Sequence, residues 1–359
     1  MKASHFYEGR PDHTFWRRAV AGVEPRAVDP VVSFPFRLSP EDKIATAGSC
    51  FAQHIARNLK TSGYNYFVVE KGHPLGADVP DLENSFSYGV FSARYGNIYT
   101  ARQLRQLFDR AFGNFTPEEQ DWSTSEGRWF DPFRPNIQPD GFASQKELIV
   151  NRAQHLAAVR RMFEELDVFV FTLGLTEAWS AREDGAILPI CPGVIAGNYD
   201  EIRYEFVNFS VSEVVEDLTT FSKGLFQINP SARIILTVSP VPLVATAEDR
   251  HVLQSTILSK SVLRVACDLL TEGSDKIAYF PSYETVMNPA AKFANFAADL
   301  RTVTEPAVQQ VMDLFLKHAT TKGRMTPCPE KSTKAEYFYT SVSEIVELIC
   351  DEQLLDQPK

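Results

Sequence analysis

Short apolar runs alternate with longer amphipathic stretches through the middle of the chain. The apolar runs are rich in aliphatic and aromatic residues and lie at residues 43–48, 65–69, 167–173, 231–239 and 276–280. Continuous apolar runs of this length are typical of parallel strands that are covered on both faces. The stretches between them repeat apolar residues every three or four positions, which predicts helices. The pattern therefore predicts an α/β fold, a three-layer αβα arrangement with a parallel sheet of about five strands.

The same patterning divides the chain into three parts. Residues 1–42 are rich in Pro and aromatic residues, which predicts an extended N-terminal arm on the domain surface. Residues 43–318 hold the alternating pattern and form the domain. Residues 319–359 are more polar and predict a C-terminal tail with one amphipathic helix near 341–354.

Two segments interrupt the alternation of strand and helix. Weaker strand patterns at 185–190 and 203–208 enclose a loop with Gly and Pro, which predicts a β-hairpin excursion. Residues 113–143 form a long irregular insertion with several Trp and Phe residues. An insertion of this length is often functional, and a lid over a site is one interpretation. The other is that its aromatic residues pack against the shoulder of the domain.

Gly48-Ser49 lies between the first predicted strand and a predicted helix with Phe51, Ile55 and Leu59 on one face. This position puts the Ser49 hydroxyl at a helix N-terminus, where N–H groups and the helix dipole favour an anion or a developing alkoxide. Gly48 allows a sharp turn and a close approach by a substrate. The alternative is that Ser49 only caps the helix, since Ser is a preferred N-cap residue.

Two further strand ends carry polar residues, at Gly174-Leu175-Thr176-Glu177 and at Ser239-Pro240. Because the carboxyl ends of parallel strands meet at one edge of a sheet, these segments are expected beside Ser49. Glu177 is interpreted as a ligand for a substrate hydroxyl, as a base, or as an ion-pair partner of an arginine such as Arg94. Trp179 either stacks on a sugar or nucleotide ring or serves packing.

The cluster Ser259-Lys260-Ser261 lies on a predicted helix. It is interpreted either as a site for an anion, such as a phosphate or the tail of coenzyme A, or as a solvated helix face.

Composition excludes several classes of function. The net charge is −10 and no run of Lys and Arg exceeds two residues, which argues against nucleic-acid binding. No apolar stretch reaches the ~20 residues of a membrane span, and the N-terminus lacks an apolar signal region. The five cysteines are scattered, so neither a disulfide framework nor a metal site is expected. We expect a protein of the reducing cytoplasm, and the oligomeric state stays open.

Several runs resemble the signatures of one protein family. Gly48-Ser49-Cys50-Phe51-Ala52 resembles the motif that names the GSCFA family, which is related to the SGNH, or GDSL-like, hydrolases. The similarity continues through most of residues 43–315, in runs at 95–100, 172–179, 237–242, 259–261 and 279–284. The resemblance implies a flavodoxin-like sheet with a serine nucleophile at the end of the first strand, where Ser49 stands.

The resemblance also implies partners for that serine. An oxyanion hole is expected from the N–H of Gly89, with Gly96 as its competitor, together with Gly174 and a donor at Thr176 or Glu177. The position of the Asp-x-x-His of SGNH enzymes holds Asp299-Leu300-Arg301-Thr302 and lacks the histidine. The base is therefore expected at His251, in Glu248-Asp249-Arg250-His251, with Asp249 or Glu248 orienting the imidazole. His54, His73 and His155 are not expected to take part.

Three functions follow from the resemblance. The first is a serine esterase that removes an O-acyl group, such as acetyl, from a carbohydrate or small molecule. The second is an acyltransferase that uses the same serine in polysaccharide modification, with a coenzyme A thioester as a conceivable donor. The third is a binding protein that keeps the fold and has lost turnover. No other cofactor is expected.

Overall fold

A parallel sheet forms the centre of the computed structural model, which describes residues 5–72, 86–323 and 354–355. The sheet has four strands in the order β1 (Ile44–Gly48), β4 (Val168–Leu173), β8 (Arg233–Val238) and β9 (Ile277–Tyr279). All neighbouring pairs are parallel. Since β4 and β8 are central, almost all of their side chains are buried, as their apolar runs predict.

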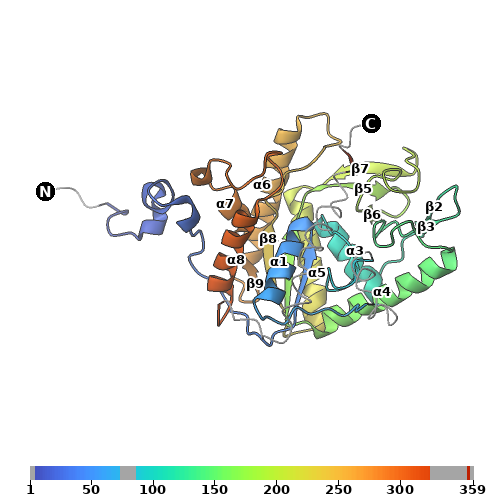
Figure 1. The fold of residues 1–359 in the computed structure, drawn as a ribbon, viewed down its shortest axis with the longest axis horizontal. Coiled ribbons are helices and arrows are strands. Elements are labelled where there is room, and N and C mark those ends of the chain that lie inside the picture. The colour runs from blue at the N-terminus through green and yellow to red at the C-terminus, as the bar shows by residue number, and fades with distance from the viewer. Residues whose placement is uncertain (1–4, 73–85, 324–353, 356–359) are drawn as a thin grey trace.

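Helices cover both faces of this sheet (Figure 1). Successive side chains of a strand point to opposite faces, so Val168 and Val170 contact one layer while Phe169 and Phe171 contact the other. The first layer contains α1 (Cys50–Thr61), α7 (Ser282–Val286) and α8 (Glu305–Ala319). The second contains α3 (Ala101–Phe112), α4 (Gln145–Glu165), α5 (Val211–Ile228) and α6 (Val252–Thr271). The predicted three-layer α/β arrangement is confirmed.

The fifth strand predicted at 65–69 is reduced to one parallel bridge between Ile44 and Tyr66. Beyond that bridge another segment occupies the edge of β1. The Thr46 N–H donates to Ser92 Oγ (3.1 Å), and the Ile98 N–H donates to the Gly48 carbonyl (2.9 Å). Because residues 92–98 satisfy these backbone groups, β1 has no further strand partner there, and the segment ending at Tyr99 is brought to the carboxyl edge of the sheet.

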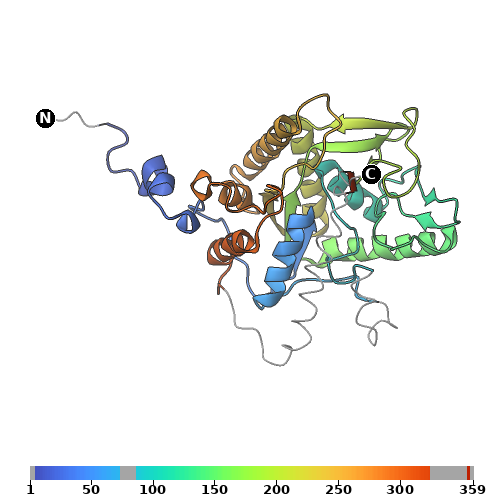
Figure 2. The same cartoon turned by 45° about the horizontal axis from the view of Figure 1, so that its top comes forward.

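The prediction of a hairpin between 185–190 and 203–208 is wrong: both segments form strands, but each pairs with a third strand that lies between them in an antiparallel sheet (Figure 2). Its order is β6 (Ile187–Leu188), β5 (Glu177–Ala181) and β7 (Tyr204–Asn208). The central strand β5 was not predicted, because Glu-Ala-Trp-Ser-Ala lacks a strand pattern of its own. Its conformation comes from pairing with β7 from Glu177 to Ala181.

The insertion at 113–143 packs against the shoulder of the domain. It contains a short antiparallel pair, β2 (Trp122–Ser123) and β3 (Trp129–Phe130), and buries Trp122, Phe133 and Phe142. Residues of this insertion do not line the cavity at Ser49 described below. The packing interpretation therefore accounts for its aromatic residues.

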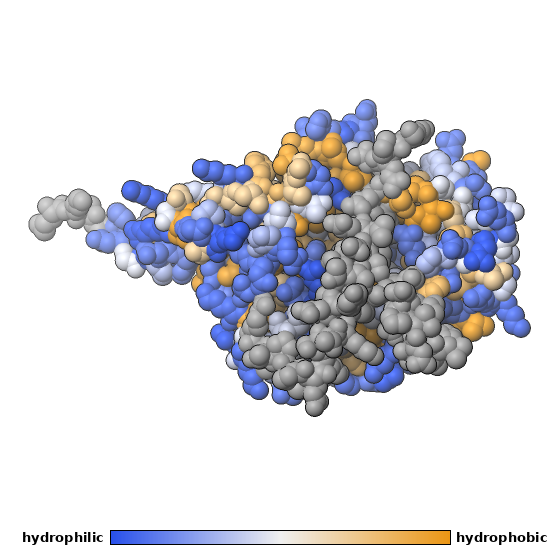
Figure 3. Space-filling view, viewed as in Figure 1, coloured by the Kyte–Doolittle hydropathy of each residue, from blue (hydrophilic) through white to orange (hydrophobic). Residues whose placement is uncertain are grey.

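The N-terminal arm only partly follows the domain surface. Three short helical segments, η1 (Asp12–Thr14), η2 (Arg17–Ala21) and η3 (Pro25–Ala27), bury none of their residues. The arm reaches the domain at Pro25, whose carbonyl accepts from Asn288 and Gln310, beside η4 (Pro289–Ala291). Earlier residues extend away from the body (Figure 1). The visible surface of this arm is largely hydrophilic, whereas apolar surface gathers at the upper edge of the domain (Figure 3).

The helix predicted near 341–354 lies outside the described residues, except for its last position. Within the described ranges, none of the helices has the length and apolar character needed to cross a membrane.

Candidate active site

Three strand ends meet at the carboxyl edge of the parallel sheet, as the sequence predicts. Gly48 pairs with Thr172, and Leu173 pairs with Val238, so the residues that follow each strand are neighbours. A small cavity opens there, lined by Ser49, Tyr99, Gly174, Leu175, Ser239 and Lys260, with part of the 241–243 segment.

The Ser49 hydroxyl faces this cavity without a hydrogen bond. Ser49 precedes α1 in N-cap position, but its side chain accepts no bond from the helix. Its Oγ is buried and has no partner among the described residues. A capping hydroxyl would bond a backbone N–H of the first turn. The Ser49 side chain therefore does not cap α1 in this structure, and its buried hydroxyl belongs to a residue that lines the cavity.

Gly48 sets the sharp turn between β1 and Ser49. Its φ of +141° is rarely adopted by residues with a side chain, and a Cβ there would lie 2.3 Å from the Thr172 carbonyl oxygen. The Ser49 N–H donates to the same oxygen at 3.3 Å. This contact fixes Ser49 against β4, and the predicted role of Gly48 in the turn agrees with its conformation.

Gly174 forms the opposite wall of the cavity. A Cβ on Gly174 would lie 3.2 Å from both the Ser49 Cβ and the Tyr99 carbonyl oxygen, so a larger residue would require its neighbours to shift by a few tenths of an ångström. The Gly174 N–H donates to the Tyr99 carbonyl (3.0 Å) and the Leu175 N–H to the same oxygen (3.1 Å). Gly174 is therefore at the site, but the N–H expected to serve an oxyanion already has an acceptor.

Lys260 is the basic side chain of this cavity. It is 2% exposed although it lies on a helix, and its Nζ donates to the Gly174 carbonyl oxygen. The neighbouring Ser259 is also buried, and its Oγ accepts from the Thr176 N–H (3.0 Å). Both side chains hydrogen-bond to backbone groups of the segment that follows β4. The solvated-face interpretation is wrong for Ser259 and Lys260, and only Ser261 is exposed.

His251 lies away from Ser49 in this structure. It is the exposed N-cap of α6, and its Nδ1 accepts from the Leu253 N–H at 3.1 Å. None of the described histidines lines the Ser49 cavity. The two residues expected to orient His251 lie in other environments. Glu248 accepts from the Asn208 amide (3.0 Å), and Asp249 is exposed.

Thr176 and Glu177 anchor loops beside the cavity. The Thr176 hydroxyl donates to Asn208 Oδ1 (2.7 Å), so it is turned away from Ser49. Glu177 accepts from the Thr246 hydroxyl (2.7 Å) and does not pair with Arg94, which is buried beside Glu70. Burial raises the pKa of Glu177, while the bond from Thr246 lowers it in part. Trp179 packs edge-on against Tyr199 and Phe206.

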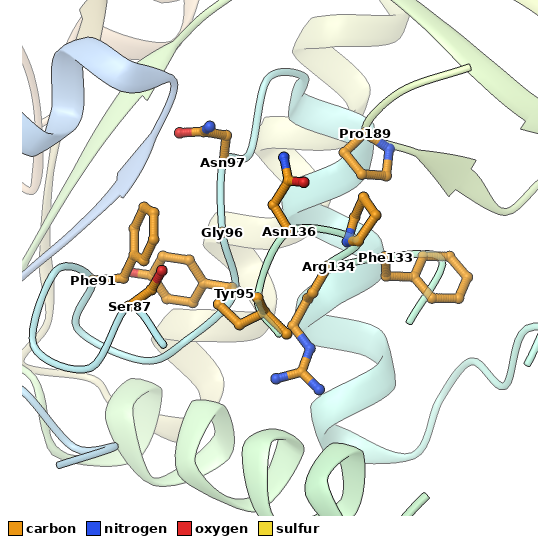
Figure 4. A pocket seen from close by; sticks show the side chains of 11 residues that line it. Ser87, Phe91, Tyr95, Gly96, Asn97, Phe133, Arg134, Asn136 and Pro189 are labelled. Atoms are coloured by element: carbon orange, nitrogen blue, oxygen red, sulfur yellow. The ribbon is translucent and has the colours of Figure 1, made fainter. Parts of the chain in front are cut away.

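Gly89 is not at the site. Its carbonyl oxygen accepts from Lys60 Nζ in the last turn of α1, whereas Ser49 precedes the first turn. Its competitor Gly96 lines a separate hollow with Ser87 and Asn136 (Figure 4). In that view the Asn97 side chain points away from the hollow toward α1, in agreement with its bond from Gln53 (3.2 Å).

His54 and His155 do not line the Ser49 cavity. Burial lowers the pKa of His54 to about 4, and its ring lies against Phe51. Burial and the nearby Arg134 lower the pKa of His155 to about 4, and its Nδ1 is 2.8 Å from Glu70. His73 lies outside the described residues.

The site residues that sequence reasoning missed are Tyr99 and Leu243, and it missed the position of Lys260 at Ser49. Tyr99 and Lys260 belong to the runs 95–100 and 259–261, which resemble the family signatures. The sequence of these runs does not indicate that either residue lies beside Ser49. The described residues contain no group of three or more His, Cys, Asp or Glu side chains arranged to hold a metal ion.

Fold and site together define an α/β protein with a buried, unbonded serine at the carboxyl edge of a parallel sheet. The model of the GSCFA family matches residues 43–315, more than half of the chain. The chain belongs to the GSCFA family. Searches of curated proteins and of solved structures returned no match.

Proposed function

We propose that this protein is a serine esterase of the SGNH type that acts through an acyl-Ser49 intermediate. The observation that carries the proposal is the buried Ser49 hydroxyl, which has no hydrogen-bond partner among the described residues and faces a cavity at the start of α1. Nucleophilic serines occupy such positions because the N-terminus of a helix stabilises negative charge that develops beside it. The expected substrate is an O-acyl ester of a carbohydrate or small molecule.

The reaction then has two halves. Ser49 Oγ attacks the ester carbonyl carbon and its proton passes to a base, which gives a tetrahedral oxyanion. Cleavage of the ester C–O bond releases the alcohol, which takes the proton back. A water molecule next attacks the acyl-serine, the base accepts the water proton, and the acid leaves as Ser49 recovers its hydrogen.

Lys260 is our proposed proton acceptor. It is the basic side chain that lines the Ser49 cavity, and it bonds Gly174, which packs directly on Ser49. An amine accepts a proton only in its neutral form. Catalytic hydrogen bonds are commonly longer in unliganded enzymes and shorten when substrate binds.

The proposed function is tested by trapping the intermediate. A fluorophosphonate probe should attach to wild-type protein at the peptide that contains Ser49, as read by mass spectrometry. Ser49→Ala should take up no probe, because no other described serine combines this position with an unbonded hydroxyl at the cavity. Equal labelling of both proteins would refute the proposal.

The proton acceptor is tested by two substitutions that differ in charge. Lys260→Arg places a permanently protonated group there, which cannot accept a proton, and Lys260→Met removes the amine altogether. Both are expected to lower kcat for p-nitrophenyl acetate by about 10²–10⁴-fold, the usual contribution of a general base. His251→Ala should retain wild-type kcat.

Circular dichroism melting shows whether the Lys260 variants are folded. If His251→Ala loses activity while folded Lys260→Arg keeps it, the base is His251 and not Lys260.

A further inference from the structure

A second, larger cavity adjoins the one at Ser49. It has a volume of about 280 Å³ and lies between the sheet β6-β5-β7 and the 243–247 segment. Tyr99, Leu175 and Leu243 line both cavities. Because these side chains are shared, the two cavities lie side by side.

The walls of this larger cavity are chiefly apolar. They include Ala178, Trp179, Pro189, Ile190, Val194 and Phe206, and Leu355 also contacts the space. The carboxylate in the wall, Glu177, is already bonded to Thr246. A sugar ring carries hydroxyl groups on every side and needs several polar partners in its site. A wall with so few unbonded polar groups suits a hydrocarbon chain better.

We propose that this cavity binds the acyl chain of the substrate, a medium-length alkyl chain rather than an acetyl group. This inference rests on the proposed function, since it places the ester carbonyl at Ser49. The chain then passes Tyr99, Leu175 and Leu243 and enters the space beside Trp179. The volume lies just below the usual range of about 300–1,000 Å³ for small-molecule sites and has room for a chain of several methylenes.

The first test compares p-nitrophenyl esters of increasing acyl length. Each fully buried methylene raises kcat/KM by up to roughly fourfold. With about two or three of the additional methylenes of octanoate fully buried, we expect kcat/KM to rise by about 10- to 100-fold from acetate to octanoate. If hydrolysis depends on Ser49 but kcat/KM is flat or falls with chain length, the acyl-chain inference is overturned while the proposed function stands.

The second test fills the cavity. Ala247 lines it and is exposed, so Ala247→Trp introduces an indole at the opening with little strain in the core. The ratio of octanoate to acetate kcat/KM should fall by about tenfold. Ala153→Trp is the matched control, because Ala153 is exposed on α4 and lines neither cavity. An unchanged ratio in Ala247→Trp would contradict the inference.

A binding measurement separates the two proposals. Octanamide is neutral and is not an ester, and Ser49→Ala cannot form an acyl-enzyme with any substrate. Calorimetric titration of Ser49→Ala should show octanamide binding that exceeds acetamide binding and that weakens when Ala247→Trp is added. If this pattern appears without Ser49-dependent hydrolysis, the cavity inference holds and the esterase is refuted. Absence of octanamide binding overturns the inference.

Discussion

Ser49→Ala is expected to lower kcat for ester hydrolysis by about 10⁴-fold or more while the protein stays as stable as the wild type. Removing the nucleophile of a serine enzyme has an effect of this order, because the covalent route is lost. The fold should be untouched, since the Ser49 hydroxyl makes no hydrogen bond with the described residues. Removing a buried, unpaired hydroxyl leaves stability unchanged or raises it by about 1 kcal/mol. The kinetic constants of both proteins test the expected loss of kcat, and urea denaturation tests the expected stability.

The stability measurement distinguishes a nucleophile from a helix cap. Loss of a capping serine destabilises a protein by about 1 kcal/mol. Ser62→Ala is a matched control: Ser62 follows the other end of α1, and its Oγ is likewise buried without a partner. Ser62→Ala should keep both activity and stability. Full activity in Ser49→Ala, or a loss of stability near the capping value, would mean that Ser49 is structural.

Asp131→Asn is expected to destabilise the protein by about 3–5 kcal/mol, the usual effect of breaking a buried ion pair. The Asp131 carboxylate is fully buried in the 113–143 insertion. Its Oδ2 accepts from Arg134 at 3.0 Å and from Arg152 at 3.3 Å. Figure 4 shows Arg134 pointing out of its hollow and toward α4. Asparagine keeps the shape but leaves these buried guanidinium groups without their counter-charge.

The effect should depend on pH in a defined direction. Burial by itself raises the pKa of Asp131, but Arg134, Arg152 and Arg110 outweigh it and hold the pKa well below its usual value. A carboxyl whose folded pKa is lowered stabilises the protein above its unfolded pKa of about 3.9 and loses this contribution as pH falls through the folded value. The difference in unfolding free energy between wild type and Asp131→Asn should be constant from about pH 5 to 8 and shrink below about pH 4.

Urea denaturation across this pH range measures the difference. Asp275→Asn is the control, since Asp275 is exposed. A surface substitution of this kind is expected to change stability by less than about 0.5 kcal/mol. If Asp131→Asn is no more destabilising than Asp275→Asn, Arg110, Arg134 and Arg152 do not need the Asp131 carboxylate as their counter-charge.

Much of the fold could be predicted because the pattern of apolar residues in each segment agrees with the burial of that segment in the structure. The apolar runs at β4 and β8 indicated central strands, and their register brought Gly48, Gly174 and Ser239 to one edge. The pattern failed where pairing depended on other segments. Residues 65–69 have strand character, yet Ser92 and Ile98 occupy the edge of β1. Glu177–Ala181 lack strand character, yet β7 pairs with them along their whole length.

The expected partners of Ser49 also show the difference between features that local pattern predicts and features that depend on distant segments. The spacing of Glu248 and His251 resembled an acid–base pair, but His251 caps α6 and lies outside the cavity. Lys260 looked like part of a polar helix face, because periodicity assigns charged residues to solvent. Its burial is stabilised by the Gly174 carbonyl, a partner from a distant strand end. A buried polar residue is hard to predict from one sequence, since its acceptor comes from elsewhere in the chain.

The sequence by itself determined the layered α/β domain, the Gly48-Ser49 turn between strand and helix, and the meeting of three strand ends. These features follow from side-chain periodicity and backbone freedom, which are local properties. Only the tertiary structure decided that the Ser49 hydroxyl is buried with no hydrogen bond to the described residues, that Lys260 lines the same cavity, and that a larger, chiefly apolar cavity lies next to it. Those facts are distances between segments far apart in the chain, and they depend on how the loops and helices pack over the sheet.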